Sequence, residues 1–369
     1  MKIIAHLTSV HPRSDTRIFV KQCRSLAAYG YDVTLIVADN KGAAYRDGVK
    51  IVDVGWLPGR LNRMSRTTHR VFQKALSIDA DIYHLHDPEL IPAGLKLKKL
   101  GKTVIFDSHE DIPKQFLAKP YLNFPLRWTI AKVFESYERL ACKRFDAVIA
   151  ATPFIRNKFQ AINPNTIDVN NFPLLGELYT ERGWNKKQLE VCYVGTIGIN
   201  RGLKQMVMAM SMVKSEVRLQ IGGMFSSSKL KNDVNRYKGW SRVDELGFLD
   251  RNAVKDLLAR SVAGLVTLHP IINYIDAFPV KMFEYMSAGI PVIASNFPLW
   301  RNIVEGNNCG LCVDPLDPGA IAGAIDHLVG NPELASYMGK NGRQAIEEKY
   351  NWTIEERKVI SLYEKLKQH

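Results

Sequence analysis

The sequence predicts an α/β protein in which two domains are each built on a doubly wound parallel sheet. Residues 2–8 have the pattern of a buried strand, and a loop, a helix and a second strand at 32–37 follow them. The order of strand, loop and helix starts again at residues 189–201. A chain of 369 residues is long enough for two domains with separate hydrophobic cores.

A change to polar sequence in the middle of the chain is typical of a linker between domains. We therefore place the N-terminal domain at residues 1–172, the linker at 173–187 and the C-terminal domain at 188–351. An amphipathic segment at 352–369 closes the chain.

The composition is that of a soluble globular protein, but the charge is unusually positive. Hydrophobic residues make up 46% of the chain and charged residues 24%, and no apolar run is long enough to span a membrane. The net charge of +13 implies an anionic partner: nucleic acid, a sugar nucleotide or an anionic membrane surface. The N-terminus enters a strand directly, which argues against a signal peptide and favours a cytoplasmic location.

The five cysteines also fit a reducing compartment, because they are scattered and odd in number. The spacing of Cys309 and Cys312 invites a redox or zinc interpretation, but a second pair is absent and the motif runs into a predicted strand. We therefore interpret both as small buried residues.

Two loops of the N-terminal half are placed to bind a ligand, because parallel strands bring their carboxyl ends to one edge of the sheet. The first loop lacks the glycine fingerprint of a dinucleotide site and carries Arg13, Asp15 and Arg17 instead. Asp15 suits the N-cap of the next helix. Arg17 either contacts an acceptor or a phosphate, or lies on the helix surface. The second loop carries His109 and Glu110.

Two further N-terminal segments have open interpretations. The helix predicted over residues 60–74 is amphipathic, with arginine and lysine largely opposite its apolar residues. Its basic face is either solvated or in contact with a membrane surface or lipid phosphate, together with Trp56 and Leu57. The aromatic residues of 121–130 belong either to an acceptor-binding surface or to the core.

The strand–loop–helix unit that opens the C-terminal half has features of a phosphate site. Gly195 and the glycines after it let the backbone approach an anion at a helix N-terminus, and Arg201 and Lys204 add positive charge. The spacing is not that of a P-loop.

The stretch 276–295 reads as a loop, a short helix, a Gly-Ile-Pro turn and a buried strand. Asp276 lies before the helix, and Lys281 and Glu284 lie inside it. Free backbone amides of the two residues after Asp276 would hold sugar hydroxyls or a phosphate at the helix start. A capped core helix with an incidental ion pair explains the same spacing equally well.

The segment 276–295 resembles the signature of glycosyltransferase family 4, in which two acidic residues with seven residues between them precede a small-Gly-x-Pro-Val strand. That family usually has glutamate first, where this chain has Asp276. Residues 11–36 resemble the N-terminal unit of a bacterial polysaccharide-biosynthesis branch of the family. The resemblance implies the GT-B fold, with two Rossmann-like domains facing across a cleft and residues 352–369 packed on the N-terminal domain.

The resemblance also implies roles for individual residues. Three would be catalytic: His109 at the reacting hydroxyls, Asp276 at the sugar and Glu284 at the ribose. The donor would be bound by Gly195, Thr196, Arg201, Lys204, Gly247, Phe248, Ala277, Phe278, Pro279 and Lys281. The acceptor or phosphate loop would comprise Arg13, Asp15, Arg17 and Glu110. We expect neither a cofactor nor a divalent metal, because basic side chains and loop amides can balance the charge of the diphosphate.

The implied reaction moves a hexose from a UDP- or GDP-linked sugar to a glycan or lipid-linked hydroxyl, with retention of the anomeric configuration. We expect it to serve cell-surface polysaccharide biosynthesis (lipopolysaccharide or capsule), in the cytoplasm or peripherally on the inner face of the membrane. The alternatives are a nucleotide-sugar epimerase or phosphorylase of the same fold, a non-catalytic sugar-nucleotide sensor, and a nucleic-acid-binding protein. The last explains the charge, but no nucleic-acid-binding fold is recognised, so we expect no nucleic-acid partner.

Overall fold

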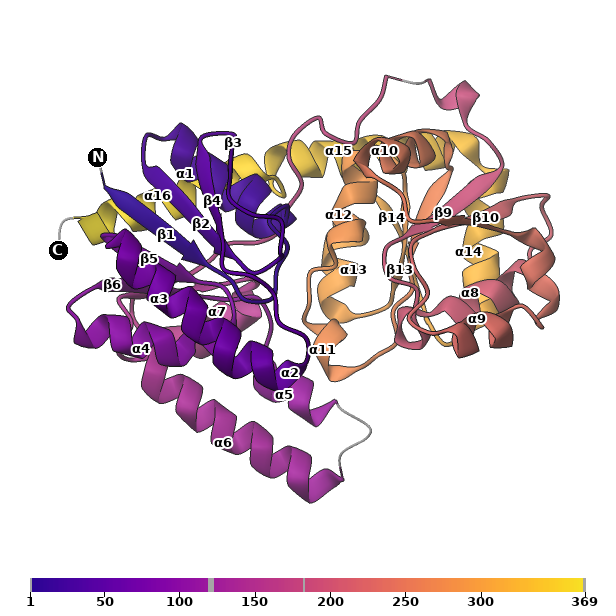
Figure 1. The fold of residues 1–369 in the computed structure, drawn as a ribbon. Helices are drawn as coiled ribbons and strands as arrows, with labels where there is room; N and C mark the ends of the chain where they lie inside the picture. The colour runs from indigo at the N-terminus through magenta and orange to yellow at the C-terminus, as the bar shows by residue number, and fades with distance from the viewer. Residues whose placement is uncertain (1, 119–122, 182, 368–369) are drawn as a thin grey trace. The chain divides into compact units, whose positions relative to one another are not determined.

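A computed structural model describes residues 2–118, 123–181 and 183–367 of the chain (Figure 1). The predicted segments that extend outside these ranges are 1–172, 121–130, 173–187 and 352–369, and only their described parts are compared below. The chain divides into two compact units, which are Met1–Asn171 with Ile354–His369, and Phe172–Thr353.

The first unit contains an eight-stranded sheet with the strand order β3-β4-β2-β1-β5-β6-β7-β8. Neighbouring strands are parallel except β3, which pairs antiparallel with β4 at one edge. The chain order reverses at β1, which pairs with β2 on one side and β5 on the other, and doubly wound sheets bind ligands at such a point. The strands are Ile3–Leu7 (β1), Asp32–Val37 (β2), Ala44–Arg46 (β3), Val49–Asp53 (β4), Ile82–Leu85 (β5), Thr103–Ser108 (β6), Ala147–Ala150 (β7) and Thr166–Asp168 (β8).

The helix after the first loop begins as a π-helix, Thr16–Cys23 (η1), and continues as the α-helix Arg24–Ala28 (α1). The side chain of Asp15 accepts hydrogen bonds from the backbone of Arg17 and Ile18, which confirms it as the N-cap. The other helices are Arg60–Asn62 (α2), Arg63–Thr67 (η2), Thr68–Ile78 (α3), Pro88–Leu90 (η3), Ile91–Lys99 (α4), Ile112–Leu117 (α5), Phe124–Cys142 (α6), Pro153–Gln160 (α7) and Trp352–Lys367 (α16). Figure 1 shows α5 and α6 side by side.

The last helix, α16, contributes to the core of the first unit. Val359 and Tyr363 of α16 are fully buried. The Tyr363 hydroxyl lies 2.7 Å from Nδ1 of His84 in β5, and the exposed Tyr29 hydroxyl donates to Glu364. The chain therefore returns to its first unit after completing the second.

The second unit contains a six-stranded parallel sheet with the order β11-β10-β9-β12-β13-β14, and its order reverses at β9. Its strands are Glu190–Val194 (β9), Arg218–Gly222 (β10), Val243–Gly247 (β11), Ala263–Val266 (β12), Val292–Ser295 (β13) and Gly310–Val313 (β14). Its helices are Trp184–Lys186 (η4), Ile199–Arg201 (η5), Leu203–Met210 (α8), Ser228–Val234 (α9), Lys238–Arg242 (η6), Arg251–Arg260 (α10), Ile272–Ile275 (α11), Val280–Ser287 (α12), Pro298–Val304 (α13), Pro318–Gly330 (α14) and Pro332–Glu348 (α15).

The helix α12 is fixed against the second sheet by one tyrosine. Tyr285 is fully buried, and its hydroxyl accepts a hydrogen bond from the Val194 amide at 3.0 Å. Gly264 in β12 makes room for this ring, because a Cβ at that position would lie 2.2 Å from Cδ2 of Tyr285. Gly289 follows the helix with φ +73°, as a C-terminal glycine should. The apolar face of α12 thus places its polar residues at the carboxyl edge of β9.

The two sheets confirm the predicted fold class of two parallel α/β domains. Among the described helices, none has both the length and the hydropathy that a membrane crossing requires. Cys309 is buried, Cys312 is half-buried, and both are free thiols.

Candidate functional site

Glu284, the acidic residue predicted inside the helix, is held by an arginine from another element. It lies one turn into α12, and its side chain is 13% exposed. Its Oε1 accepts a hydrogen bond from Nη1 of Arg251 at 2.5 Å, and Nε of Arg251 donates to Glu177 at 2.8 Å. Burial opposes the charge of Arg251, but the two carboxylates outweigh it and raise the pKa of the guanidinium. Arg251 and Glu177 carried no signal in the sequence, because they are distant along the chain from Glu284.

Lys281 is half-buried and places its amine beside the glycine loop after β9. Its Nζ lies 3.6 Å from the centroid of the Tyr193 ring and would lie 3.2 Å from a Cβ on Gly195. No carboxylate of the described residues lies within ion-pair distance. Burial holds the pKa of Lys281 well below its usual value, the nearby Arg201 lowers it further, and Glu284 opposes both. The amine is therefore placed to gain from the arrival of an anion.

The backbone of the loop after β9 approaches the loop after β10 so closely that Gly223 has no room for a side chain. Gly195 has φ +120°, and its carbonyl would lie 1.9 Å from a Cβ on Gly223. The carbonyl of Thr196 accepts a hydrogen bond from the Tyr193 hydroxyl at 2.7 Å. Arg201 follows, with its guanidinium carbon 4.8 Å from the centroid of the Tyr274 ring.

Three further residues were predicted to bind the donor. Lys204 and Gly247 lie near this loop, whereas Phe248 is exposed to solvent. Lys204 is half-buried in the first turn of α8. Gly247 ends β11, and its carbonyl accepts a hydrogen bond from the Gly223 amide at 2.7 Å. Phe248 is 78% exposed, which leaves its ring available as a surface for a base.

The loop before α12 differs from the prediction in one respect. The Ala277 amide is not free, because it donates to the Tyr274 carbonyl at 3.1 Å and so completes the last turn of α11. Asp276 ends α11 as its C-cap. The Phe278 ring stacks on Phe172, and Pro279 is the N-cap of α12. Ala277 therefore cannot supply a hydrogen bond to a sugar without breaking that turn.

In the first unit, Asp107 at the end of β6 is the centre of a buried polar cluster. Arg17 donates to both of its oxygens, from Nε at 3.0 Å and Nη2 at 2.7 Å, and Gln22 donates at 2.8 Å. Burial would raise the pKa of Asp107, but Arg17 and His109 outweigh it and hold the pKa well below its usual value. Arg17 also donates to the Val169 carbonyl at 2.6 Å. It is buried, so the alternative that places Arg17 on the helix surface is wrong.

A row of histidines extends from this cluster. His6 and His86 are 2.8 Å apart, from Nδ1 to Nε2, and Nδ1 of His86 lies 3.5 Å from Asp107 Oδ2. Burial lowers the pKa of His86 to about 3, and it lowers the pKa values of His6 and His84 well below the usual value. These three imidazoles are therefore neutral at physiological pH.

His109 is the member of this row that reaches solvent, with a side chain that is 19% exposed. Its Nε2 lies 3.4 Å from Oδ2 of Asp107 and 3.4 Å from Nδ1 of His86. Its ring also lies against that of His11, at 5.0 Å between centroids. Asp107 therefore anchors one nitrogen of His109, which leaves Nδ1 for a ligand.

The predicted acceptor loop is tied down internally. Arg13 donates to both oxygens of Asp39 at 2.7 Å and to the Gly42 carbonyl. Asp15 pairs with His11, and despite its burial this pair and the backbone amides lower the pKa of Asp15 to about 2. Glu110 is exposed.

Two groups of side chains in the described part of the chain could hold a metal ion. They are His6 with His84 and His86, and His86 with Asp107 and His109, each with ligand atoms within 4.8 Å of one another. Their members lie in β1, β5 and β6 or just after β5 and β6, so no local sequence pattern could indicate these groups.

Two family sequence models match this chain. Residues 16–169 match "Glycosyltransferase Family 4", and residues 177–345 match "Glycosyl transferases group 1". The chain is also 22% identical over 324 residues to a phosphatidyl-myo-inositol mannosyltransferase of Mycobacterium tuberculosis, an alignment that covers 82% of this chain and 78% of that protein.

The structure is similar to solved structures along almost its whole length. Sucrose-phosphate synthase from Thermosynechococcus elongatus has a TM-score of 0.80 at 19% identity over 99% of both chains. The Anabaena protein HepE in complex with UDP has a TM-score of 0.73 at 14% identity, covering 99% of this chain and all of the other. At these identities the likeness concerns the fold.

Proposed function

Because the chain belongs to glycosyltransferase family 4 and is a glycosyltransferase of the GT-B type, we propose that it transfers a hexose from a UDP- or GDP-linked sugar to a hydroxyl of a glycan or lipid-linked acceptor. The anomeric configuration is retained, and the product contributes to a cell-surface polysaccharide. The second unit supplies the donor-binding groups, and the first unit supplies the acceptor-binding groups.

The observation that carries the donor assignment is the desolvated amine of the half-buried Lys281 beside the Gly195 loop. A desolvated amine that pairs with no carboxylate of the described residues is unfavourable, and a diphosphate on this loop would supply negative charge. Arg201, the last residue of η5 and two residues before α8, adds a second cation. The complex of HepE with UDP, a protein of similar fold, supports a nucleoside diphosphate as the ligand.

In the proposed reaction, the acceptor hydroxyl attacks the anomeric carbon from the same face of the sugar from which the nucleoside diphosphate leaves. The leaving diphosphate oxygen takes the proton of the acceptor hydroxyl as the new glycosidic bond forms. Lys281, Arg201 and Lys204 stabilise the charge that develops on the diphosphate, and no divalent metal takes part. Glu284 accepts hydrogen bonds from the ribose hydroxyls, with Arg251 holding its carboxylate in position.

His109 orients the reacting hydroxyls. A proton on Nε2 faces Asp107, so Nδ1 carries a lone pair that accepts a hydrogen bond from a substrate hydroxyl. The neutral His86 behind it adds no positive charge.

A lipid-linked acceptor and peripheral membrane contact fit the surface around α2. Leu61 is 83% exposed, Trp56 and Met64 are also exposed, and Arg60 and Arg66 lie among them. Exposed apolar groups next to arginines suit an anionic lipid surface. The mycobacterial relative is named for transfer to a phosphatidylinositol.

A thermal-shift screen with UDP, GDP, ADP and their sugars tests the donor assignment, because a ligand that binds the folded chain raises its melting temperature. We expect a shift with UDP or GDP compounds that Lys281→Met removes. NMR of the product then reads its anomeric configuration, and inversion contradicts the proposal. Epimer formation without acceptor, or phosphate-dependent cleavage of a glycan, would instead identify one of the alternative activities.

A further inference from the structure

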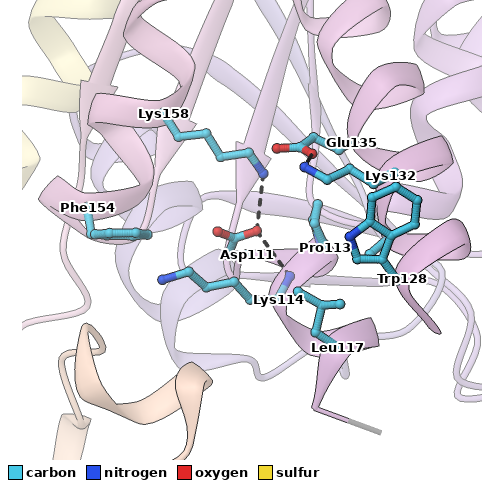
Figure 2. A pocket seen from close by; sticks show the side chains of 10 residues that line it. Asp111, Pro113, Lys114, Leu117, Trp128, Lys132, Glu135, Phe154 and Lys158 are labelled. Atoms are coloured by element: carbon cyan, nitrogen blue, oxygen red, sulfur yellow. Dashed lines mark hydrogen bonds and ion pairs between the residues drawn. The ribbon is translucent and has the colours of Figure 1, made fainter. Parts of the chain in front are cut away.

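A pocket of about 290 Å³ lies among α5, α6 and α7 of the first unit (Figure 2). Its wall starts at Asp111, two residues after His109. Figure 2 shows Trp128 of α6 and Phe154 of α7 on opposite sides, with Asp111, Lys114 and Lys158 between them. The volume is at the lower end of the range for small-molecule sites, roughly 300–1,000 Å³, and suits a sugar ring better than a nucleotide.

The aromatic side chains of the pocket are accessible. Trp128 is 50% exposed and Phe154 is 40% exposed, although both are large apolar groups that folding normally buries. The Lys114 ammonium lies 3.7 Å from the centroid of the Phe154 ring, so a cation already occupies one face of that ring. Trp128 therefore offers the better surface for stacking against the C–H face of a sugar.

Asp111 keeps one carboxylate oxygen available. Its Oδ1 accepts from Lys158 Nζ at 3.2 Å and from the Lys114 amide at 3.4 Å, as the dashed lines in Figure 2 show. Its Oδ2 accepts a hydrogen bond from no residue in the described ranges. A carboxylate that is fixed through one oxygen and open at the other is suited to a sugar hydroxyl.

The charges in and behind the pocket are balanced. Lys158 pairs with Asp111 and with the buried Glu138, and Lys132 pairs with Glu135. Together with Lys114 these are three lysines and three carboxylates, so the wall and the Glu138 carboxylate behind it have no formal net charge when counted together. This balance disfavours a phosphate or a polyanion and favours an uncharged ligand.

We propose that this pocket is an acceptor subsite that binds an uncharged sugar ring, stacked on Trp128 and hydrogen-bonded to Asp111. The inference rests on the proposed glycosyl transfer and narrows its acceptor to an oligosaccharide or polysaccharide chain. One sugar of that chain presents its hydroxyl near His109, and another sugar occupies the pocket.

An array of neutral and anionic oligosaccharides, incubated with the full chain, tests the subsite. We expect binding to at least one neutral glycan, weakened roughly tenfold by Trp128→Ala, retained in Trp128→Phe and weakened by Asp111→Asn, which keeps the helix cap. Tyr45→Ala is the matched control, because Tyr45 is an exposed aromatic residue of β3 far along the sheet from the pocket, and it should bind like the wild type.

Circular dichroism and melting temperature check that each variant is folded. Unchanged neutral-glycan binding by Trp128→Ala, binding to anionic glycans alone, or no glycan binding by a chain that still binds UDP or GDP would each overturn the subsite. A chain that binds neither nucleotide nor glycan would instead contradict the proposed function. The two failures are therefore distinguishable.

Discussion

The buried Asp107 and the half-buried Lys281 respond to the loss of hydration in opposite ways. Asp107 receives hydrogen bonds from Arg17 and Gln22, and these compensate for its lost hydration and keep it ionised. Lys281 has a tyrosine ring as its neighbour and no carboxylate within ion-pair distance among the described residues. The first arrangement is stable without a ligand, whereas the second gains from one.

Nucleotide binding should therefore be accompanied by proton uptake at Lys281. The pKa of the amine is low in the free protein, and a bound diphosphate raises it, so the fraction of protonated lysine increases on binding. Calorimetric titration of UDP or GDP in buffers of different ionisation enthalpy measures the protons taken up. We expect this uptake at mildly alkaline pH and its loss in Lys281→Met. Equal uptake by the variant would show that another group is responsible.

The role of Glu284 predicts a large kinetic effect. Glu284→Ala should lower kcat/KM for the donor by about a hundredfold, which corresponds to roughly 2.7 kcal/mol of transition-state stabilisation. Glu177→Gln is the control, because it changes the other partner of Arg251 but leaves the carboxylate of α12 in place. Its rate should stay within about threefold of the wild type. Wild-type turnover in Glu284→Ala rejects the assignment.

At the scale of elements, α12 connects packing with the site. Tyr285 fills the space above Gly264 and bonds to the Val194 amide, so the helix cannot shift along the sheet without losing both contacts. Lys281 and Glu284 share this helix, and their positions depend on that packing.

Gly264→Ala should destabilise the second unit by about 1–3 kcal/mol, because the added methyl would lie 2.2 Å from the Tyr285 ring. Gly323→Ala is the matched control. Gly323 is inside α14 with no atom within 4 Å of the added methyl, so this change should stabilise the helix by roughly 0.5–1 kcal/mol. Denaturant unfolding measures both free energies. A neutral Gly264→Ala would show that Tyr285 moves aside freely.

At the scale of the whole molecule, the chain forms two units with separate sheets, and its C-terminal helix belongs to the first. The hydroxyl of Tyr363 on α16 bonds to His84 inside the first unit, whereas the donor-binding candidates all lie in the second. Nucleotide binding should therefore change the stability of the second unit, and a substitution in α16 should change that of the first.

Differential scanning calorimetry should resolve two unfolding transitions. UDP or GDP should raise the midpoint temperature of only one of them. Tyr363→Phe should lower the free energy of unfolding of the first unit by about 1–3 kcal/mol, because His84 loses a buried hydrogen-bond partner. The other transition should therefore move to a lower temperature. Tyr29→Phe, which removes an exposed hydrogen bond to the same helix, should change stability by less than about 0.5 kcal/mol. A shift of the nucleotide-sensitive transition in Tyr363→Phe would contradict this division.

Local spacing in the sequence was sufficient to predict the strand–loop–helix units that open the two sheets, the Asp15 cap and the glycine that ends α12. Each of these features depends on residues within one or two turns of one another, so they can be read without knowledge of the fold. The resemblance at 276–295 depends on the same kind of local pattern.

Tertiary structure alone decided which groups meet. Arg17 and Asp107 are 90 positions apart, and Glu284 and Arg251 are 33 apart, so their pairing depends on how parallel strands are ordered in the sheets. The engaged amide of Ala277 and the balanced pocket at Trp128 likewise depend on how neighbouring helices pack. The sequence determined which residues were available, and the burial of charge determined which of them had to be paired.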